Sequence, residues 1–351
     1  MSRSYITAAA RVVDGQGTLQ TVHQQWSHLR EQGARRIELV IDPLHTGWDT
    51  PVQANHFRSG CGPIEALARA DELIRAGRAD AVLITGEDNL RSQYAHDKPL
   101  RQRLMSIYDN CPLPQAYTLL ARAFMRLHGI GDVRFMQLAH TLYDNYVRTA
   151  QRQGRYKPPP PAAFEMVTDL FRAVDCANPV IDFAGAVIVA SDTCLRDDTH
   201  RIAVLGVGLG QTRDGPAHVD DIARYDHLAR ACVTAYEQAG VDLGDAFRRH
   251  RALIEVYTCF PVAPLGFLLA TGIARDVADI PAVLASYEIT VAGGMNIGRA
   301  PWNNPALNAL VAMCDRLREN AISGVACPRL GAVHGNGGLG YRQGVAMLGV
   351  A

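Results

Sequence analysis

Ile289-Thr-Val-Ala-Gly-Gly-Met-Asn-Ile-Gly-Arg-Ala-Pro-Trp-Asn-Asn304 is a glycine-rich stretch that leads from a short apolar run into a predicted helix. Two passages accompany it. Glu255-Val-Tyr-Thr-Cys-Phe-Pro261 lies upstream, and Ala332-Val-His-Gly-Asn-Gly-Gly-Leu-Gly340 lies near the C-terminus. Each adjoins an apolar run of the kind that forms a buried strand. The sequence therefore predicts three loops at strand ends.

Strands and helices alternate along the rest of the chain. Continuous apolar runs such as Ala79–Thr85 are typical of strands buried on both faces, and stretches with helical spacing such as Gly62–Ala76 separate them. Alternation of this kind favours a doubly wound α/β architecture. The predicted strands are 4–13, 36–42, 79–85, 180–190, 201–208, 252–257, 289–291, 329–333 and 344–348, and the predicted helices are 18–32, 62–76, 115–128, 133–153, 225–239, 263–272 and 305–320.

A polar break at Asp192–Thr199 is the best candidate for a boundary between two halves. We expect an N-terminal half at residues 1–195 and a C-terminal half at residues 196–351. The halves share the coarse alternation of strands and helices, with no identity at the level of residues.

The bulk composition excludes several classes of protein. The 351 residues are 48% hydrophobic and 20% charged, as in ordinary globular proteins, and the 35 basic residues equal the 35 acidic ones. No net field therefore attracts nucleic acid. No apolar stretch is long enough for a membrane span, and Arg11 interrupts the short one near the N-terminus. The eight cysteines are scattered singly, so we expect reduced thiols, no metal site and a cytoplasmic protein.

In their order and spacing, the three loops resemble the thiolase superfamily, closest to its sterol-carrier-protein-X-like branch. The resemblance covers roughly residue 55 to the C-terminus well and the first fifty residues weakly. It implies a five-layer αβαβα fold of two stacked doubly wound halves, with the strands of the halves in separate sheets. It also implies that the region 89–177 caps the pocket.

The helix that begins near Cys61 resembles the thiolase nucleophile element. There a cysteine at a helix N-terminus accepts the acyl group of a coenzyme A thioester, and the helix dipole lowers the pKa of its thiol. Gap-free matching places Gly60 at the nucleophile's position and Cys61 one residue later, a rotation of about 100° on a helix. Cys61 is therefore either a displaced nucleophile or an inert buried thiol.

In the second loop, Tyr257 takes the position of the asparagine or histidine that thiolases use for an oxyanion hole. Its phenol could donate a hydrogen bond to an oxyanion or act as an acid, or it could be a core tyrosine; Cys259 is read as packing. Ala300 takes the place of the histidine that activates the nucleophile. Asn303 and Asn304 are candidate substrate-binding residues that also suit a helix N-cap before Pro305.

The last loop resembles the family's glycine-rich turn, where a second cysteine shuttles protons and backbone N–H groups form an oxyanion hole. His334 takes that cysteine's position and has a pKa in the right range for acid–base work. We therefore expect His334 rather than Cys61 to carry the chemistry, with Asn336, Gly337 and Gly338 beside the substrate. The Gly-x-Gly-x-x-Gly spacing here opens no helix, so it does not predict dinucleotide binding. Gly206-Val-Gly-Leu-Gly210 fails that spacing as well.

The resemblance implies an enzyme of lipid metabolism acting on an acyl-CoA or acyl-carrier thioester, with no tightly bound cofactor. His334 and Tyr257 would serve an acyltransferase or a C–C bond reaction of the aldolase type. Two alternatives stay open: covalent acyl transfer through Cys61, and a non-catalytic acyl-binding subunit.

The resemblance further implies a homodimer, or a heterodimer with a paralogue, formed by pairing Asp80–Thr85 as an edge strand across a two-fold axis. A partner with an OB-fold acyl-CoA-binding domain is also expected.

Overall fold

The N-terminal half forms a mixed sheet that ends on a long N-terminal strand. The computed structural model describes residues 3–46, 50–108, 110–177, 180–194, 201–298, 300–323 and 327–351. β3 pairs in parallel with β4 and β5, whereas β6 is antiparallel to β5 and β1. The short β2 forms a hairpin with the end of β1. In spatial order the strands are β4 (His56–Phe57), β3 (Arg36–Ile41), β5 (Ala81–Asn89), β6 (Asp182–Ser191) and β1 (Ser4–Val13), with β2 at Gln16–Gly17.

The C-terminal half repeats this pairing. β8 and β9 are parallel, and β10 is antiparallel to both β9 and β7, as β6 is to β5 and β1. The expected internal repeat is therefore present in strand pairing. In spatial order these strands are β7 (Ile202–Gln211), β10 (Arg342–Val350), β9 (Leu330–Gly337) and β8 (Ala252–Glu255).

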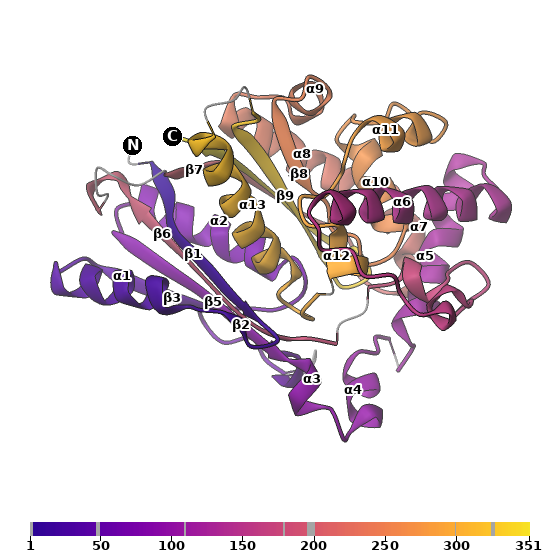
Figure 1. The fold of residues 1–351 in the computed structure, drawn as a ribbon, viewed down its shortest axis with the longest axis horizontal. Helices are drawn as coiled ribbons and strands as arrows, with labels where there is room; N and C mark the ends of the chain where they lie inside the picture. The colour runs from indigo at the N-terminus through magenta and orange to yellow at the C-terminus, as the bar shows by residue number, and fades with distance from the viewer. Residues whose placement is uncertain are drawn as a thin grey trace.

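Two helices lie between the halves and contact strands of both. α2 (Gly62–Arg75) and α13 (Pro305–Ile322) form this central layer, and Figure 1 shows α13 between β1 and β9. α1 (Gln20–Glu31) packs on β1 and β6, and α8 (Asp226–Ala239) packs on β7 and β10. The five-layer αβαβα arrangement predicted from the sequence is confirmed.

One detail of that prediction is wrong: the two sheets are not separate. β1 pairs with β7 through Tyr5 with Ala203 and Ile6 with Ile202, which joins all strands into one ten-stranded sheet. Both strands are ten residues long and antiparallel, so their ends can pair at one corner. Beyond Ile6 the strands separate, and the central helices fill the space between the halves.

The expected dimer edge is also wrong. β5 pairs with both β3 and β6, so the strand after α2 is central in its sheet. The outer strand of this half is β4, which immediately precedes Gly60. A homodimer or heterodimer stays a prediction, without the strand pairing first assigned to it.

The region between β5 and β6 is largely helical, and the predicted helices 115–128 and 133–153 are confirmed within it.

No helix in the described part of the chain is long and apolar enough to cross a membrane. The expected boundary at 195/196 lies outside the described residues. The remaining helices are α3 (Leu90–Gln93), α4 (Lys98–Leu104), α5 (Leu113–His128), α6 (Asp132–Arg152), α7 (Val219–Ala223), α9 (Leu243–Arg248), α10 (Val262–Ala270), α11 (Ile280–Ser286) and α12 (Gly294–Gly298), together with short 3₁₀ turns at Leu44–Thr46, Pro161–Phe164, Ala173–Asp175, Asp192–Cys194 and Pro216–His218.

The predicted strand 289–291 is not formed. Only one backbone hydrogen bond reaches it from the end of β8, from Val256 N–H to Ile289 O (3.1 Å). The Glu255 carboxylate instead accepts the backbone N–H groups of Val291 (2.5 Å) and Ala292 (3.2 Å). A side chain thus takes hydrogen bonds that a neighbouring strand would otherwise make.

Candidate functional site

The predicted loops meet around one cavity of about 490 Å³, here called the first chamber. Its floor comes from the start of α2, the loop after β8, the stretch before α13 and the end of β9. Segments between β5 and β6 line the rest of it, among them α4 and the start of α5. The residues that line it and lie at these strand and helix ends are Gly60, Tyr257, Cys259, Ala300, Asn303, Asn336 and Gly338.

Tyr257 places an unpaired hydroxyl group in this chamber. The side chain is 8% exposed, and its hydroxyl has no hydrogen-bond partner among the described residues. Burial raises the pKa of this phenol well above its ordinary value, with the nearby thiols and Asp88 adding to the effect. Tyr257 is therefore neutral at physiological pH and can donate a hydrogen bond to a ligand.

Gly60 leaves the space that this hydroxyl occupies. A Cβ atom on Gly60 would lie 2.1 Å from the Tyr257 hydroxyl oxygen and 2.5 Å from the backbone oxygen of Asn336. The phenol therefore stands where a side chain at position 60 would begin, the position that the resemblance matched to the nucleophile.

His334 is buried next to Tyr257, and both of its ring nitrogens have hydrogen-bond partners within the protein. The backbone N–H of Tyr257 donates to its Nδ1 (3.3 Å), and its Nε2 lies 2.7 Å from Oε1 of Gln343. These partners assign the proton to Nε2. Burial lowers the pKa of His334 to about 4, so the ring is neutral. No ring nitrogen remains for a substrate, which favours a positioning role over the predicted proton transfer.

A chain of hydrogen bonds continues from His334 to the wall of the first chamber. Gln343 Nε2 donates to Asn336 Oδ1 (2.7 Å), and Asn336 Nδ2 donates to the Tyr117 hydroxyl (3.0 Å). Tyr117 donates in turn to the backbone oxygen of Gly338 (3.0 Å). The amide of Asn336 is thus held by neighbours, and it fixes Tyr117 beside the cavity.

Cys61 lies outside the first chamber. It is fully buried in the apolar core around α2, and a Cβ on Gly344 would lie 3.0 Å from its Sγ. Burial raises the pKa of its thiol well above the ordinary value, and Glu65 adds to this. This placement favours the inert buried thiol over the displaced nucleophile.

Asn303 and Asn304 tie loops together. Asn303 Nδ2 donates to the backbone oxygen of Asp42 (2.7 Å), and its Oδ1 accepts from Ser59 N–H (3.2 Å). Asn304 Nδ2 donates to the buried Asp88 (2.8 Å). Asn303 still lines the first chamber, whereas Asn304 is fully buried and does not.

Gly337 does not line the first chamber. It packs against Ser59 instead, since a Cβ on Gly337 would lie 2.4 Å from the Ser59 hydroxyl oxygen. Gly338, with a φ of +59°, turns the chain at the chamber wall. Of the predicted site residues, the structure therefore brings Gly60, Tyr257, Asn303, Asn336 and Gly338 together.

Sequence reasoning missed three features of the site. Cys259 lines the first chamber, and burial raises the pKa of its thiol to about 12. Lys98 and Arg101 of α4 line the chamber without an ion-pair partner among the described residues. Glu255, two residues before Tyr257, is 7% exposed. A carboxyl group inside an apolar strand was the available signal for Glu255.

Within the described part of the chain, no group of His, Cys, Asp and Glu side chains is placed to hold a metal ion.

Solved structures share this architecture over the whole chain. A monomeric SCP2-thiolase-like protein type 1 from Mycobacterium smegmatis matches 99% of this chain and 77% of its own, with a TM-score of 0.69 and 17% identity. The Ltp2-ChsH2(DUF35) aldolase matches 99% of this chain and 98% of its own, with a TM-score of 0.69 and 15% identity. The chain has the thiolase fold.

A third thiolase-fold structure, the human mitochondrial 3-ketoacyl-CoA thiolase, matches 100% of this chain and 99% of its own, with a TM-score of 0.65 and 12% identity. No protein-family model matches the sequence, and no curated protein sequence does. At these identities the likeness concerns the fold alone.

Proposed function

We propose that the protein binds an acyl thioester of coenzyme A or a carrier protein in the first chamber and makes or breaks a C–C bond next to its carbonyl group. The unpaired Tyr257 hydroxyl, standing in the space that Gly60 leaves open, is the observation that carries this proposal.

In this reaction the thioester oxygen accepts a hydrogen bond from Tyr257. In the cleavage direction the proton of the substrate's β-hydroxyl group passes to a base, for which the Glu255 carboxyl is the available group. As the C–C bond breaks, the electron pair forms an enolate whose charge gathers on the thioester oxygen. A neutral phenol in a buried cavity stabilises such charge without reorganisation of solvent. His334 holds the loop that carries Tyr257 by accepting its backbone N–H, so His334 is a positioning residue here.

Two cationic side chains at the first chamber could bind the carrier of the acyl group. Lys98 and Arg101 can pair with phosphate groups of coenzyme A or of a carrier's prosthetic arm. The apolar side chains of Met105, Ile107 and Phe260 on the same walls can contact the acyl chain.

Covalent transfer through Cys61 is disfavoured by its burial and by its raised pKa, because the thiolate is the nucleophile. A non-catalytic acyl-binding subunit is the second candidate, and the methyl group of Ala300 in place of a base favours it. The name Ltp2-ChsH2(DUF35) aldolase joins two proteins, in keeping with the proposed partner that carries an OB-fold acyl-CoA-binding domain.

The test compares Tyr257→Phe with Tyr94→Phe and Cys61→Ala. Tyr94 also buries an unpaired hydroxyl, but outside the first chamber. With a panel of acyl-CoA thioesters, Tyr257→Phe should lower turnover by about 10²–10³-fold, while the other two variants stay near wild-type per folded molecule.

The thermal midpoint of Tyr257→Phe should match that of Tyr94→Phe, because neither hydroxyl has a partner to lose. Binding of thioesters without any turnover would replace the proposal with the non-catalytic one. An acyl adduct on Cys61 in mass spectrometry would replace it with covalent transfer.

A further inference from the structure

A second cavity adjoins the first chamber at Tyr257. It has a volume of about 650 Å³ and lies between β1, α13 and the end of β8; we call it the second chamber. Tyr257, Met295 and Ala300 line both chambers. A ligand in the second chamber would therefore reach the same phenol as a ligand in the first.

Glu255 lines the second chamber, and only one of its two carboxylate oxygens accepts hydrogen bonds from described residues. Its Oε2 accepts the backbone N–H groups of Val291 and Ala292. Its Oε1 has no hydrogen-bond partner among the described residues, although the side chain is more than nine-tenths buried. Burial raises the pKa of this carboxyl to about 7. The unpaired Oε1 can therefore accept a hydrogen bond from a ligand in the chamber.

Two guanidinium groups lie in the same chamber with spare donors. Arg11 Nη1 donates to the backbone oxygen (3.1 Å) and Oδ1 (2.5 Å) of Asn308, and its other donors have no partner in the described part of the chain. The Arg155 guanidinium has neither a hydrogen bond nor an ion pair with any described residue.

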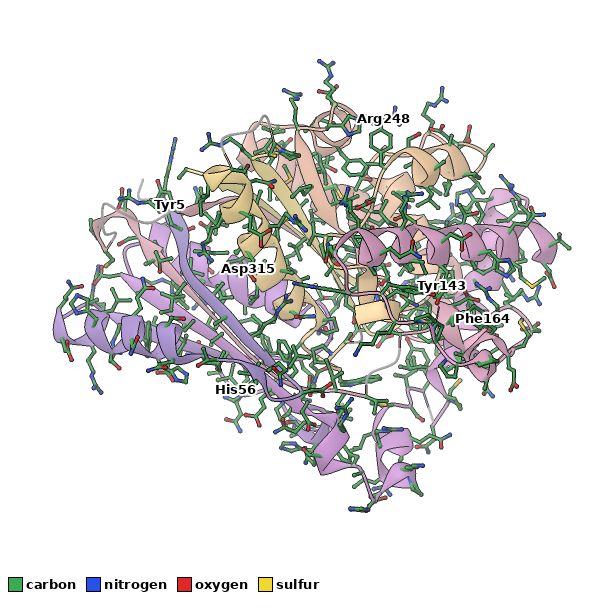
Figure 2. The ribbon with its side chains drawn as sticks, in the orientation of Figure 1. Tyr5, His56, Tyr143, Phe164, Arg248 and Asp315 are labelled. Carbon is green, nitrogen blue, oxygen red and sulfur yellow. The ribbon has the colours of Figure 1, made fainter. Side chains whose placement is uncertain are left out.

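Asp315 of α13, near the centre of the view in Figure 2, is the other carboxylate in this chamber. Two cations thus face the carboxyl groups of Asp315 and Glu255, and burial raises the pKa of both. Small apolar side chains, with Ala9, Ala150, Val256 and Ala309 among them, line much of the remaining wall, and the polar side chains of Gln16, Asn308 and His334 also reach it. The chamber suits a short carbon chain that bears one negative charge.

We propose that the second chamber is a binding site for a small organic monoanion that carries a hydroxyl group, with its carboxylate on Arg11 and Arg155 and its hydroxyl donating to Glu255. The carbonyl form of such an anion would be the second fragment of the C–C bond reaction; that part rests on the proposed function, whereas the binding itself does not.

The test measures binding of three six-carbon probes to the full chain by isothermal titration calorimetry. The probes are 3-hydroxyhexanoate, hexanoate without the hydroxyl, and hexane-1,3-diol without the carboxylate. The hydroxy acid should bind tightest and the diol weakest. Arg155→Gln should weaken the two acids by about three- to tenfold and leave the diol unchanged, because a partly exposed ion pair contributes modestly.

Glu255→Gln should weaken the hydroxy acid relative to hexanoate, because an amide group that keeps its oxygen on Val291 presents donors to the chamber instead of an acceptor. Lys98→Gln, in the first chamber, is the matched control and should leave all three probes unchanged while weakening acyl-CoA.

Absence of saturable binding of the acids at millimolar concentrations would overturn the proposal, as would binding that Arg155→Gln and Glu255→Gln leave unchanged. Failure of the proposed function is a separate result: Tyr257→Phe with normal turnover would reject that function and leave probe binding intact.

Discussion

Gly60 and Tyr257 are coupled because they compete for one volume. With a Cβ at position 60 only 2.1 Å from the phenol oxygen, any other residue there would displace the tyrosine or distort α2. The absence of a side chain at position 60 and the position of the phenol are therefore coupled. The result is a site that offers a neutral hydrogen-bond donor at this position.

His334 and Glu255 should give the free energy of unfolding opposite dependences on pH. With the pKa of His334 lowered to about 4, the unfolded chain binds more protons between about pH 4 and 6.5, so this group makes stability rise with pH there. With the pKa of Glu255 raised to about 7, the folded chain binds more protons between about pH 4.5 and 7, so stability falls with pH.

Urea unfolding from pH 4.5 to 6.5 separates the two groups. The slope of the free energy of unfolding against pH should be lower than wild-type in His334→Gln and higher in Glu255→Gln, each by up to about 1.4 kcal/mol per pH unit. Three parallel curves would show that neither group titrates differently in the folded and unfolded chains.

At the scale of elements, α8 packs so closely on β7 that its backbone contacts the strand. Gly206, Gly208 and Gly210 share one face of the strand, and a Cβ on each would lie 2.4, 1.7 and 2.0 Å from the backbone oxygens of Ala235, Ala231 and His227. These glycines, which do not have the spacing of a dinucleotide motif, allow the outer helix to approach the sheet.

Gly208→Ala should therefore destabilise the protein by about 3 kcal/mol or more, because backbone rather than a flexible side chain must move. Gly131→Ala, with open space around its Cβ and a φ of −91°, is the control; because Gly131 is the N-cap of α6, where Ala is less favourable than Gly, it should cost no more than about 1 kcal/mol. Chemical denaturation measures both, and equal stabilities of the two variants would contradict the close packing.

The strands and helices were predictable wherever their apolar period was clear. β1 has the predicted bounds, and α2, α5 and α13 agree within two residues. The strand at 289–291 was predicted from three residues, and the Glu255 side chain took its N–H groups, a tertiary contact that periodicity does not contain. The central place of β5 likewise depends on pairing with β6, a hundred residues later in the chain.

At the scale of the whole molecule, the register of the motifs located Tyr257, Gly60 and Asn336 in the site. It could not assign the roles of His334 and Cys61, because these depend on partners contributed by other elements: Gln343 of β10 engages the histidine, and the core around α2 encloses the thiol. The second chamber escaped prediction for the same reason, since β1, α6 and α13 meet there only in the folded chain.

The two stacked halves place both chambers on one residue. The last residue of β8, Glu255, lines the second chamber, Cys259 of the loop after β8 lines the first, and Tyr257 between them lines both. A reaction that joins or separates two carbon fragments needs two binding spaces that meet at the reacting carbon, and this arrangement supplies them.

The central claim is that a phenol, and not a thiolate, meets the thioester. A crystal structure of the protein soaked with an acyl-CoA tests it directly. We predict an intact thioester in the first chamber, its carbonyl oxygen about 2.5–3.0 Å from the Tyr257 hydroxyl and its phosphates beside Lys98 and Arg101. An acyl group bonded to the sulfur of Cys61 or Cys259, or a thioester bound away from Tyr257, would contradict it.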